Sequence, residues 1–177
     1  LLDMQRRQQV SEEAQGVLTI AAARVQSFAA LHTSLYSGRA FIEEVSMCHY
    51  LTSLQDDLQS ALFEDERIKI TLDCQELMMP RDRALAIGLV MNEIVTNAAK
   101  HAFSNADTGL IAIDFAATSE DEWTLTITDD GQGMAESTGD TGSGLGSRLI
   151  EAFTRKAGAR LNVERLERGT RFTLTAE

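Results

Sequence analysis

The hydrophobic pattern of this chain changes once, near residue 64, and the change limits the fold class. Upstream, six residues recur at alternating steps of three and four, which is the spacing of the contact seam in a coiled coil or a helical bundle. They are Leu18, Ala21, Val25, Phe28, His32 and Leu35. Downstream, short segments alternate apolar and polar residues as strands do. The sequence therefore predicts an α+β protein, with a helical region at residues 1–64 and an α/β sandwich at residues 65–177.

The bounds of single helices and strands follow from these patterns and from the residues that interrupt them. Ser37-Gly38 ends the seam helix, and a second helix is expected from about residue 40 to residue 63, which makes a helical hairpin. Pro80 is placed to open a helix that runs to about Ala102. A later helix is expected at 147–157, and strands are expected at 68–72, 109–115, 123–128, 160–164 and 170–175.

The charge of the chain excludes whole classes of partner. The formal net charge is −11 and the pI is near 4.7, whereas binding to nucleic acid or to an anionic membrane needs a basic surface. We therefore expect no nucleic-acid partner, and any phosphate site must be local. Hydrophobic residues make up 44% and charged residues 24% of the chain, which is typical of a folded globular protein and excludes a disordered one.

The cysteines and the apolar segments bear on location. Cys48 and Cys74 lack the spacing of a metal-binding motif, so we expect two free thiols in a reducing compartment, and a cytoplasmic location. Charges break the apolar runs well short of a membrane span, and no secretory signal is present. Membrane attachment is expected only through a segment upstream of Leu1.

One predicted helix carries three polar residues with complementary chemistry. Glu93, Asn97 and Lys100 are spaced i, i+4 and i+7, so they are expected on one helix face, opposite the apolar side. A carboxylate, a carboxamide and an ammonium group on one face can hold a divalent cation and a chain of phosphates. Charged residues on a helix are more often a solvated face, so this pattern alone is weak evidence.

Two glycine-rich turns follow this helix. Residues 129–133 read Asp-Asp-Gly-Gln-Gly after a predicted strand, and residues 142–146 read Gly-Ser-Gly-Leu-Gly before a predicted helix. Asp-Gly pairs most often make hairpin turns, and a glycine pattern like the second is common at ordinary helix starts as well as at phosphate sites. The order of all these features, which ends with a Gly169-Thr170 hairpin, is much more specific than any one of them.

In this order the features resemble the Bergerat ATP-binding fold, which histidine kinases, gyrase-type ATPases, Hsp90 and MutL share. Residues 92–103, Asn-Glu-x-x-x-Asn-Ala-x-Lys-His-Ala-Phe, look most like sensor histidine kinases of the HisKA_2 type. Residues 24–36 are similar to the second dimerisation helix of that group, and the short segment at 135–141, without an aromatic residue, resembles its short lid. The resemblance covers essentially the whole chain. It implies a two-layer sandwich with a mixed sheet that binds ATP and Mg²⁺.

The resemblance also implies roles for the residues of the predicted helix. Asn97 matches the asparagine whose side-chain oxygen binds Mg²⁺, a cation that prefers oxygen ligands. Glu93 matches an acid that orients or activates the nucleophile, and it is the candidate catalytic residue. Lys100 and His101 would contact phosphate oxygens.

Further roles are implied for the turns. Asp129 matches the aspartate that accepts a hydrogen bond from the adenine amino group, and Gly131 and Gly133 would let the backbone pass close to the base. Thr170 matches a position near adenine. Gly144 and Gly146 would present backbone N–H groups to the phosphates at the start of a helix. The same motifs contain the further candidate nucleotide-binding residues Met134, Gly142 and Leu145.

The implied function is that of a two-component histidine kinase. The γ-phosphoryl group of ATP would pass to a histidine and then to an aspartate on the receiver domain of a response regulator. None of the three histidines, His32, His49 and His101, matches the acceptor motif, so the acceptor is expected upstream of Leu1. The hairpin seam would suit a homodimeric four-helix bundle or an intramolecular bundle.

Three alternatives are weighed against this reading. A phosphotransfer or phosphatase protein could retain a vestigial nucleotide site, but the nucleotide motifs here are intact. A serine kinase of the anti-sigma-factor type shares the ATP-binding fold but usually lacks a helical hairpin like that expected at residues 11–62. A pure interaction module would leave the glycine motifs unexplained.

Overall fold

The computed structural model describes residues 44–63, 67–103, 108–133 and 145–177. The seam at residues 18–35 therefore lies outside the described residues. The elements are β1 (Glu44–Ser46), α2 (Met47–Leu62), β2 (Ile68–Cys74), β3 (Met78–Pro80), α3 (Arg81–His101), β4 (Gly109–Ser119), β5 (Glu122–Asp129), α4 (Leu145–Lys156), β6 (Ala159–Arg165) and β7 (Thr170–Ala176). All five predicted strands are confirmed, as β2, β4, β5, β6 and β7.

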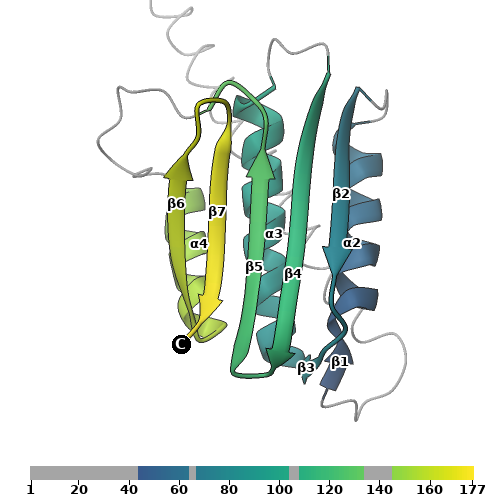
Figure 1. The fold of residues 1–177 in the computed structure, drawn as a ribbon, viewed down its shortest axis with the longest axis vertical. Helices are drawn as coiled ribbons and strands as arrows, with labels where there is room; N and C mark the ends of the chain where they lie inside the picture. Colours follow the sequence, from purple (N-terminus) through teal and green to yellow (C-terminus); the bar gives the residue numbers. More distant parts are fainter. Residues whose placement is uncertain (1–43, 64–66, 104–107, 134–144) are drawn as a thin grey trace, which may run out of the picture. The chain divides into compact units, whose positions relative to one another are not determined.

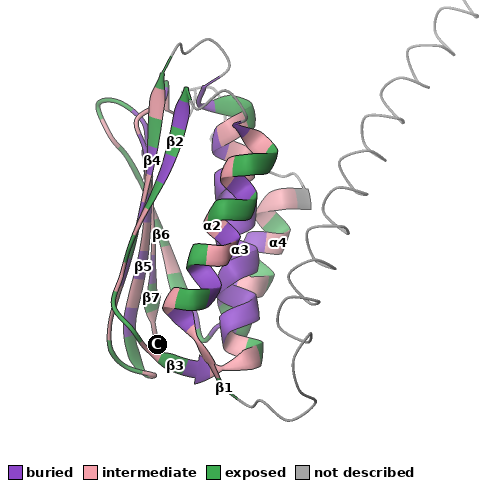
Figure 2. Ribbon diagram, turned by 90° about the vertical axis from the view of Figure 1, so that its right-hand side faces the viewer, coloured by how far each residue is buried: buried purple, intermediate pink, exposed green. Residues whose placement is uncertain are grey.

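The five longer strands form one sheet in the order β2-β4-β5-β7-β6. The β2–β4 pair is parallel and the other pairs are antiparallel, so the predicted mixed sheet is confirmed. The helices α2, α3 and α4 lie together on one face of this sheet, which gives two layers (Figures 1 and 2). The short strands β1 and β3 pair separately, antiparallel to each other.

Strand β5 shows how the local pattern directs its side chains. Trp123, Leu125 and Ile127 are buried, while the threonines between them are partly exposed. Because successive side chains of a strand point to opposite faces, the next residue in the buried series is Asp129. Its carboxylate therefore lies on the side of the sheet that the helices cover.

Helix α3 lies in the centre of the helical layer. It packs against both α2 and α4, and thirteen of its residues are buried. Gly88 faces Tyr50 of α2 so closely that an added Cβ would overlap the tyrosine ring and hydroxyl, so glycine permits this approach of the two helices. The predicted helix from Pro80 to about Ala102 is confirmed, with Pro80 at the N-cap and Ala102 at the C-cap.

The start of α2 corrects the prediction of a helix from about residue 40. Residues 44–46 are strand β1, and α2 begins at Met47. Two contacts explain this boundary. The β1 backbone pairs with β3, and the Ser46 side chain accepts a hydrogen bond from the His49 N–H at 3.2 Å, as an N-cap residue does. Sequence periodicity does not report such pairing, and β1 and β3 were not predicted.

The packing of α2 also bears on the predicted division at residue 64. Helix α2 contacts α3 and β2, and residues 41–177 form one compact unit. The side chain of Gln59 forms part of this contact: its Nε2 donates to Ile68 O at 3.0 Å and its Oε1 accepts from Ile70 N at 2.8 Å. Gln59 thus satisfies the outer backbone edge of β2, so α2 belongs by packing to the sheet that follows it.

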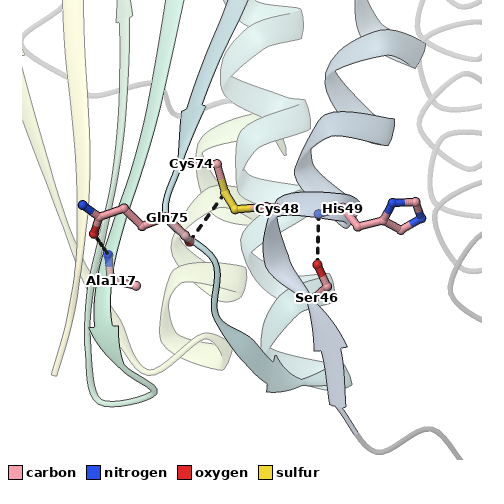
Figure 3. Close-up of a disulfide and its surroundings, with 6 residues drawn as sticks. All are labelled: Ser46, Cys48, His49, Cys74, Gln75 and Ala117. Carbon is pink, nitrogen blue, oxygen red and sulfur yellow. Dashed lines mark hydrogen bonds between the residues drawn. A yellow bond between two sulfur atoms is a disulfide. The ribbon is translucent and has the colours of Figure 1, made fainter.

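The expectation of two free thiols is wrong, because Cys48 and Cys74 form a disulfide (Figure 3). The two residues are 26 positions apart in the sequence, but their Cα atoms lie 5.6 Å apart. Packing of α2 beside β2 brings them within the normal range for a disulfide. The argument for a reducing compartment from free thiols is therefore removed. Among the described residues, no helix has both the length and the apolar content needed to cross a bilayer.

Candidate functional site

The candidate site lies where three segments meet: the end of β5, the start of β7 and the C-terminal end of α3. Asp129 and Thr170 are register partners in the β5–β7 pair. The turn after Asp129 then reaches the last residues of α3, because Gln132 N donates to Ala102 O at 3.0 Å. The structure therefore brings together the predicted residues Asp129, Gly131, Thr170 and His101, which lie on separate elements.

The Asp129 carboxylate is buried, with 5% of the residue exposed, and is held by two backbone donors. Its Oδ1 accepts from Gly131 N at 3.0 Å, and its Oδ2 accepts from Thr170 N at 3.2 Å. Each carboxylate oxygen can accept more than one hydrogen bond, so the group keeps acceptor capacity for a ligand. Burial raises the pKa of Asp129 above its ordinary value, and the two hydrogen bonds oppose this rise.

The glycines near Asp129 permit close contacts between elements. Gly169 has φ +87°, and a Cβ there would overlap the carbonyl oxygen of Asp129. At Gly131, a Cβ would lie 2.5 Å from the Cβ of Ala102 and 2.6 Å from its carbonyl oxygen. The nearest neighbour of Gly131 is therefore the end of α3. Contact with α3 is therefore one structural reason for glycine at position 131. The other reason, close approach of the backbone to a nucleotide base, stays a prediction.

Two residues without a predicted role hold the turn in place. Gln132 Nε2 donates to His101 O at 2.8 Å, so this side chain satisfies a carbonyl at the end of α3. On the other side, Asp130 Oδ1 accepts from Leu110 N at 2.7 Å. Both residues lie inside the Asp-x-Gly-x-Gly motif at variable positions, and the motif itself does not indicate their partners. The turn is thus fastened to α3 and to β4.

The polar residues of α3 differ in burial along the helix. Glu93 is buried, with 5% exposed, whereas Asn97 is half-buried and Lys100 is exposed. The prediction that all three lie opposite the buried side is wrong for Glu93. The reason is that α3 is covered by neighbours on several sides, so its middle turns have no solvent face. His101 is exposed. Asn92, which precedes Glu93 in the sequence, is buried.

The second glycine motif is described only in part. Met134, Gly142 and Gly144 lie outside the described residues, and so does the lid at 135–141. Gly133, the last described residue of the first turn, has φ +73°. Leu145 and Gly146 are the first two residues of α4, which starts two residues before the predicted 147. The backbone N–H groups of a first helical turn have no partner within their helix, so Gly146 is on an element suited to anions.

The hydrogen-bond acceptors and oxygen ligands of the site fit an adenine nucleotide with a magnesium ion. A buried carboxylate with free acceptor capacity suits an exocyclic amino group, and the Asn97 amide offers an oxygen ligand. No cluster of three or more His, Cys, Asp or Glu side chains able to hold a metal occurs in the described part of the chain.

Comparison with known families identifies both parts of the chain. Residues 82–177 match the sequence model of the histidine kinase-, DNA gyrase B- and HSP90-like ATPases. Residues 1–62 match the HisKA_2 model, described as histidine kinase. The second match ends at the last residue of α2. Helix α2 therefore falls within the HisKA_2 match, although it packs with the sheet.

Individual relatives agree with these matches. The chain is 35% identical over 104 residues to blue-light-activated histidine kinase 2 of Erythrobacter litoralis, covering 58% of this chain and 30% of that protein. It is 30% identical over 135 residues to the sensor histidine kinase PdtaS of Mycolicibacterium smegmatis, covering 76% of this chain and 26% of that protein. The chain thus spans less than a third of the length of these two relatives.

A solved structure shares the fold. The histidine kinase domain of the Erythrobacter litoralis EL346 blue-light activated histidine kinase superposes with a TM-score of 0.76 at 26% sequence identity. The match covers 88% of this chain and 73% of that one. The predicted α+β class with the ATPase-type sandwich is therefore confirmed.

Proposed function

Because this chain belongs to the histidine kinase-, DNA gyrase B- and HSP90-like ATPase family, and within it to the histidine kinases of the HisKA_2 type, we propose that it binds ATP with Mg²⁺ and phosphorylates a histidine. The phosphoryl group then passes to an aspartate of a response regulator. The observation that carries the proposal is the Asp129 carboxylate, buried and oriented by Gly131 N and Thr170 N.

Asp129 selects the base in this proposal. An ionised carboxylate accepts hydrogen bonds only, so it pairs with the amino group of adenine and rejects the carbonyl that guanine has at the same position. The two backbone donors leave the carboxylate no freedom to turn away, and Gln132 keeps the adjacent turn against α3. Thr170 and Gly131 act here as positioning residues through their N–H groups.

The polar residues of α3 bind the phosphate groups of ATP and the Mg²⁺ ion in this proposal. The Asn97 oxygen is a ligand for Mg²⁺, Lys100 and His101 contact phosphate oxygens, and Glu93 orients the attacking imidazole. When bound, Mg²⁺·ATP supplies the γ-phosphoryl group and the charge neutralisation that its transfer requires. The burial of Glu93 supports a role at a single fixed position, because a buried side chain loses rotamer freedom.

The N-terminus of α4 completes the phosphate site in this proposal. Gly146 lies in its first turn, where a missing side chain leaves the backbone N–H groups open to an anion. Met134, Gly142, Gly144 and Leu145 remain proposed nucleotide-binding residues on the basis of the motif. The region at 1–64 is proposed to serve phosphotransfer and dimerisation, and the chain is proposed to act in the cytoplasm.

Binding of nucleotide tests this function directly. Calorimetric titration of ATP in excess Mg²⁺ should give saturable binding, with GTP much weaker. The Asn97→Ala variant should lose the Mg²⁺-dependent part of the affinity while it keeps the metal-free part, because only the oxygen ligand is removed. No heat of binding from either nucleotide would instead favour the alternative of a vestigial site.

Phosphoryl transfer needs a second assay. In a chain extended upstream to include an acceptor histidine, incubation with γ-labelled ATP should label the protein with an acid-labile, base-stable bond. Asn97→Ala should abolish this label. Normal labelling of that variant would contradict the assignment of Asn97, and an acid-stable label on serine would favour the anti-sigma-type kinase.

A further inference from the structure

The disulfide joins two elements at one end of the helical layer. Cys48 is the second residue of α2, and Cys74 is the last residue of β2 (Figure 3). Neither residue belongs to the nucleotide site, and both are half-buried. The bond therefore has no role in the proposed kinase chemistry, yet small reagents in solution can reach it.

Both cysteines are carried on well-held backbone. On the Cys74 side, Gln75 N donates to Phe115 O at 2.8 Å, and the Gln75 Oε1 accepts from Ala117 N at 3.0 Å. On the Cys48 side, Met47 N donates to Leu77 O at 2.9 Å. None of these contacts involves sulfur. The two thiols would therefore stay close to each other after the bond is broken.

The rest of α2 is attached to the sheet without the disulfide. Five of its side chains are buried, and they are Met47, Tyr50, Leu51, Leu54 and Leu58. Near its other end, Gln59 makes two hydrogen bonds to the β2 backbone, and Gln55 Nε2 donates to Ile70 O at 3.2 Å. Loss of the disulfide removes one of several attachments, so the reduced chain should remain folded.

The surroundings of both sulfur atoms also suit the reduced state. Cys48 lies in the first turn of α2, at the positive end of the helix dipole. The Sγ of Cys74 lies 3.7 Å from the carbonyl oxygen of Gln75, which can accept the proton of a Cys74 thiol. A bond that is half-exposed and whose reduced form is accommodated differs from a purely structural disulfide.

We propose that Cys48 and Cys74 form a reversible thiol–disulfide modification site that responds to low-molecular-weight thiols and disulfides. In oxidation, the Cys48 thiolate attacks one sulfur of a small disulfide, and a small thiolate leaves. The Cys74 thiolate then attacks the Cys48 sulfur of this mixed disulfide, and the second small thiolate leaves. The two protons lost by the cysteines protonate the two leaving thiolates, so one disulfide replaces another.

The site controls how firmly the start of α2 is held. Strand β1 and the first turn of α2 connect residues 1–43 to the sheet, and the HisKA_2 match runs through this connection to residue 62. In the oxidised chain a covalent bond fixes the first turn of α2 to β2. In the reduced chain, β1 and that turn are held by the β1–β3 pairing, by the hydrogen bond from Met47 N to Leu77 O and by side-chain packing.

Thiol counting across a redox series tests the proposal. The chain is equilibrated in buffers with different ratios of reduced to oxidised glutathione and is then alkylated with a maleimide. Mass spectrometry of the intact protein counts the alkylated cysteines. We expect two alkylated cysteines under reducing conditions and none under oxidising conditions, in either direction of approach. Circular dichroism should be the same in both states. The oxidised chain should melt roughly 5–10 °C higher, because a cross-link restricts the unfolded chain.

Hydrogen exchange locates the change. In the reduced chain the amides of β1 and of the first turn of α2 should exchange several-fold faster, while those next to Gln59 should not change. A double variant, Cys48→Ser with Cys74→Ser, is the control. It should melt like the reduced chain at every glutathione ratio and should show the faster exchange in all buffers.

Three outcomes would overturn the proposal. The first is alkylation only after denaturation, which means a permanent structural bond. The second is two free thiols even in excess oxidised glutathione. The third is a disulfide that forms only between two chains. Thiol counting needs no nucleotide, so a chain that fails to bind ATP would contradict the proposed kinase function and leave this test unaffected.

Discussion

Asp129 Oδ2 accepts a hydrogen bond from Thr170 N at 3.2 Å, across the antiparallel pair of β5 and β7. The other oxygen of the same carboxylate accepts from Gly131 N at 3.0 Å. A strand and a turn that are separated by about 40 residues in the chain thus orient one acid. This fixed orientation is what a base-recognising acceptor needs, because hydrogen bonds weaken steeply as their angle departs from linear.

Replacement of this acid should weaken ATP binding. In Asp129→Asn, an NH₂ group takes the place of one acceptor oxygen, and a bond to a charged acceptor is lost. Such a loss costs about 1.5–3 kcal/mol, which is roughly a 10- to 100-fold rise in the ATP dissociation constant. Calorimetry in Mg²⁺ measures it. The matched control is Asp130→Asn, which should bind ATP within a few-fold of the wild type. Equal loss in both variants would contradict a specific role for Asp129.

The pH dependence of ATP binding should report the same group. Burial raises the pKa of Asp129 above its ordinary value, so the carboxylate protonates at a higher pH than an exposed aspartate. The ionised form is the acceptor for adenine, so ATP affinity should fall on acidification through that raised pKa. In the Asp129→Asn variant this step should be absent. An identical pH profile in wild type and variant would exclude Asp129 as the titrating acceptor.

The same shift predicts how stability changes with pH. The folded chain holds the Asp129 proton more tightly than the unfolded chain does. The contribution of this residue to stability is therefore largest below its unfolded pKa and is lost as the pH rises through its folded pKa. Urea unfolding over this acidic range should show Asp129→Asn gaining stability relative to the wild type as the pH rises.

Two glycines with positive φ allow a matched test of close packing. Gly169 and Gly158 have φ of +87° and +65°, but only Gly169 has a neighbour, Asp129, that an added Cβ would overlap. Gly158→Ala should cost about 1 kcal/mol of unfolding free energy, the price of a left-handed non-glycine residue. Gly169→Ala should cost about 1–3 kcal/mol more, from overpacking, and should weaken ATP binding. Similar melting temperatures for the two variants would contradict this account.

The Gln59 side chain should stabilise the edge of the sheet. Gln59→Ala removes the partners of Ile68 O and Ile70 N on the outer edge of β2, and should lower the free energy of unfolding by about 1–3 kcal/mol. Gln55→Ala, which removes a single longer bond, should cost less. Urea denaturation measures both variants, and ATP affinity should be unchanged because the hydrogen bonds of Gln55 and Gln59 go to the β2 backbone and not to the Asp129 turn. An equal or smaller cost for Gln59→Ala would show that the bidentate contact is not important.

The elements of the sheet were largely predictable from the sequence. Alternation of apolar and polar residues is a local property, and a strand that is covered on one face expresses it directly. In β5, for example, the series Trp123, Leu125 and Ile127 leads to Asp129, so the inward direction of this carboxylate follows from residue spacing alone. Helix α3 was also predictable from a local signal, because Pro80 marks its start.

The errors concern contacts between residues that are distant in the sequence. Residues 44–46 were predicted as helix because their pairing partner, β3, lies more than 30 positions further on. Glu93 was expected on an exposed face because periodicity does not show that α3 has neighbours on several sides. Gln132 was overlooked because its partner, the His101 carbonyl, is backbone and has no sequence signal.

The sequence by itself determined the types of the elements, the order of the nucleotide motifs and the direction in which Asp129 points, because each depends on the spacing of near neighbours. Tertiary structure alone decided the burial of Glu93, the anchoring of the Asp130-Gly131 turn to α3 and β4, and the bond between Cys48 and Cys74. These features depend on which surfaces pack together. Packing is set by the whole chain at once, so no local pattern reports it.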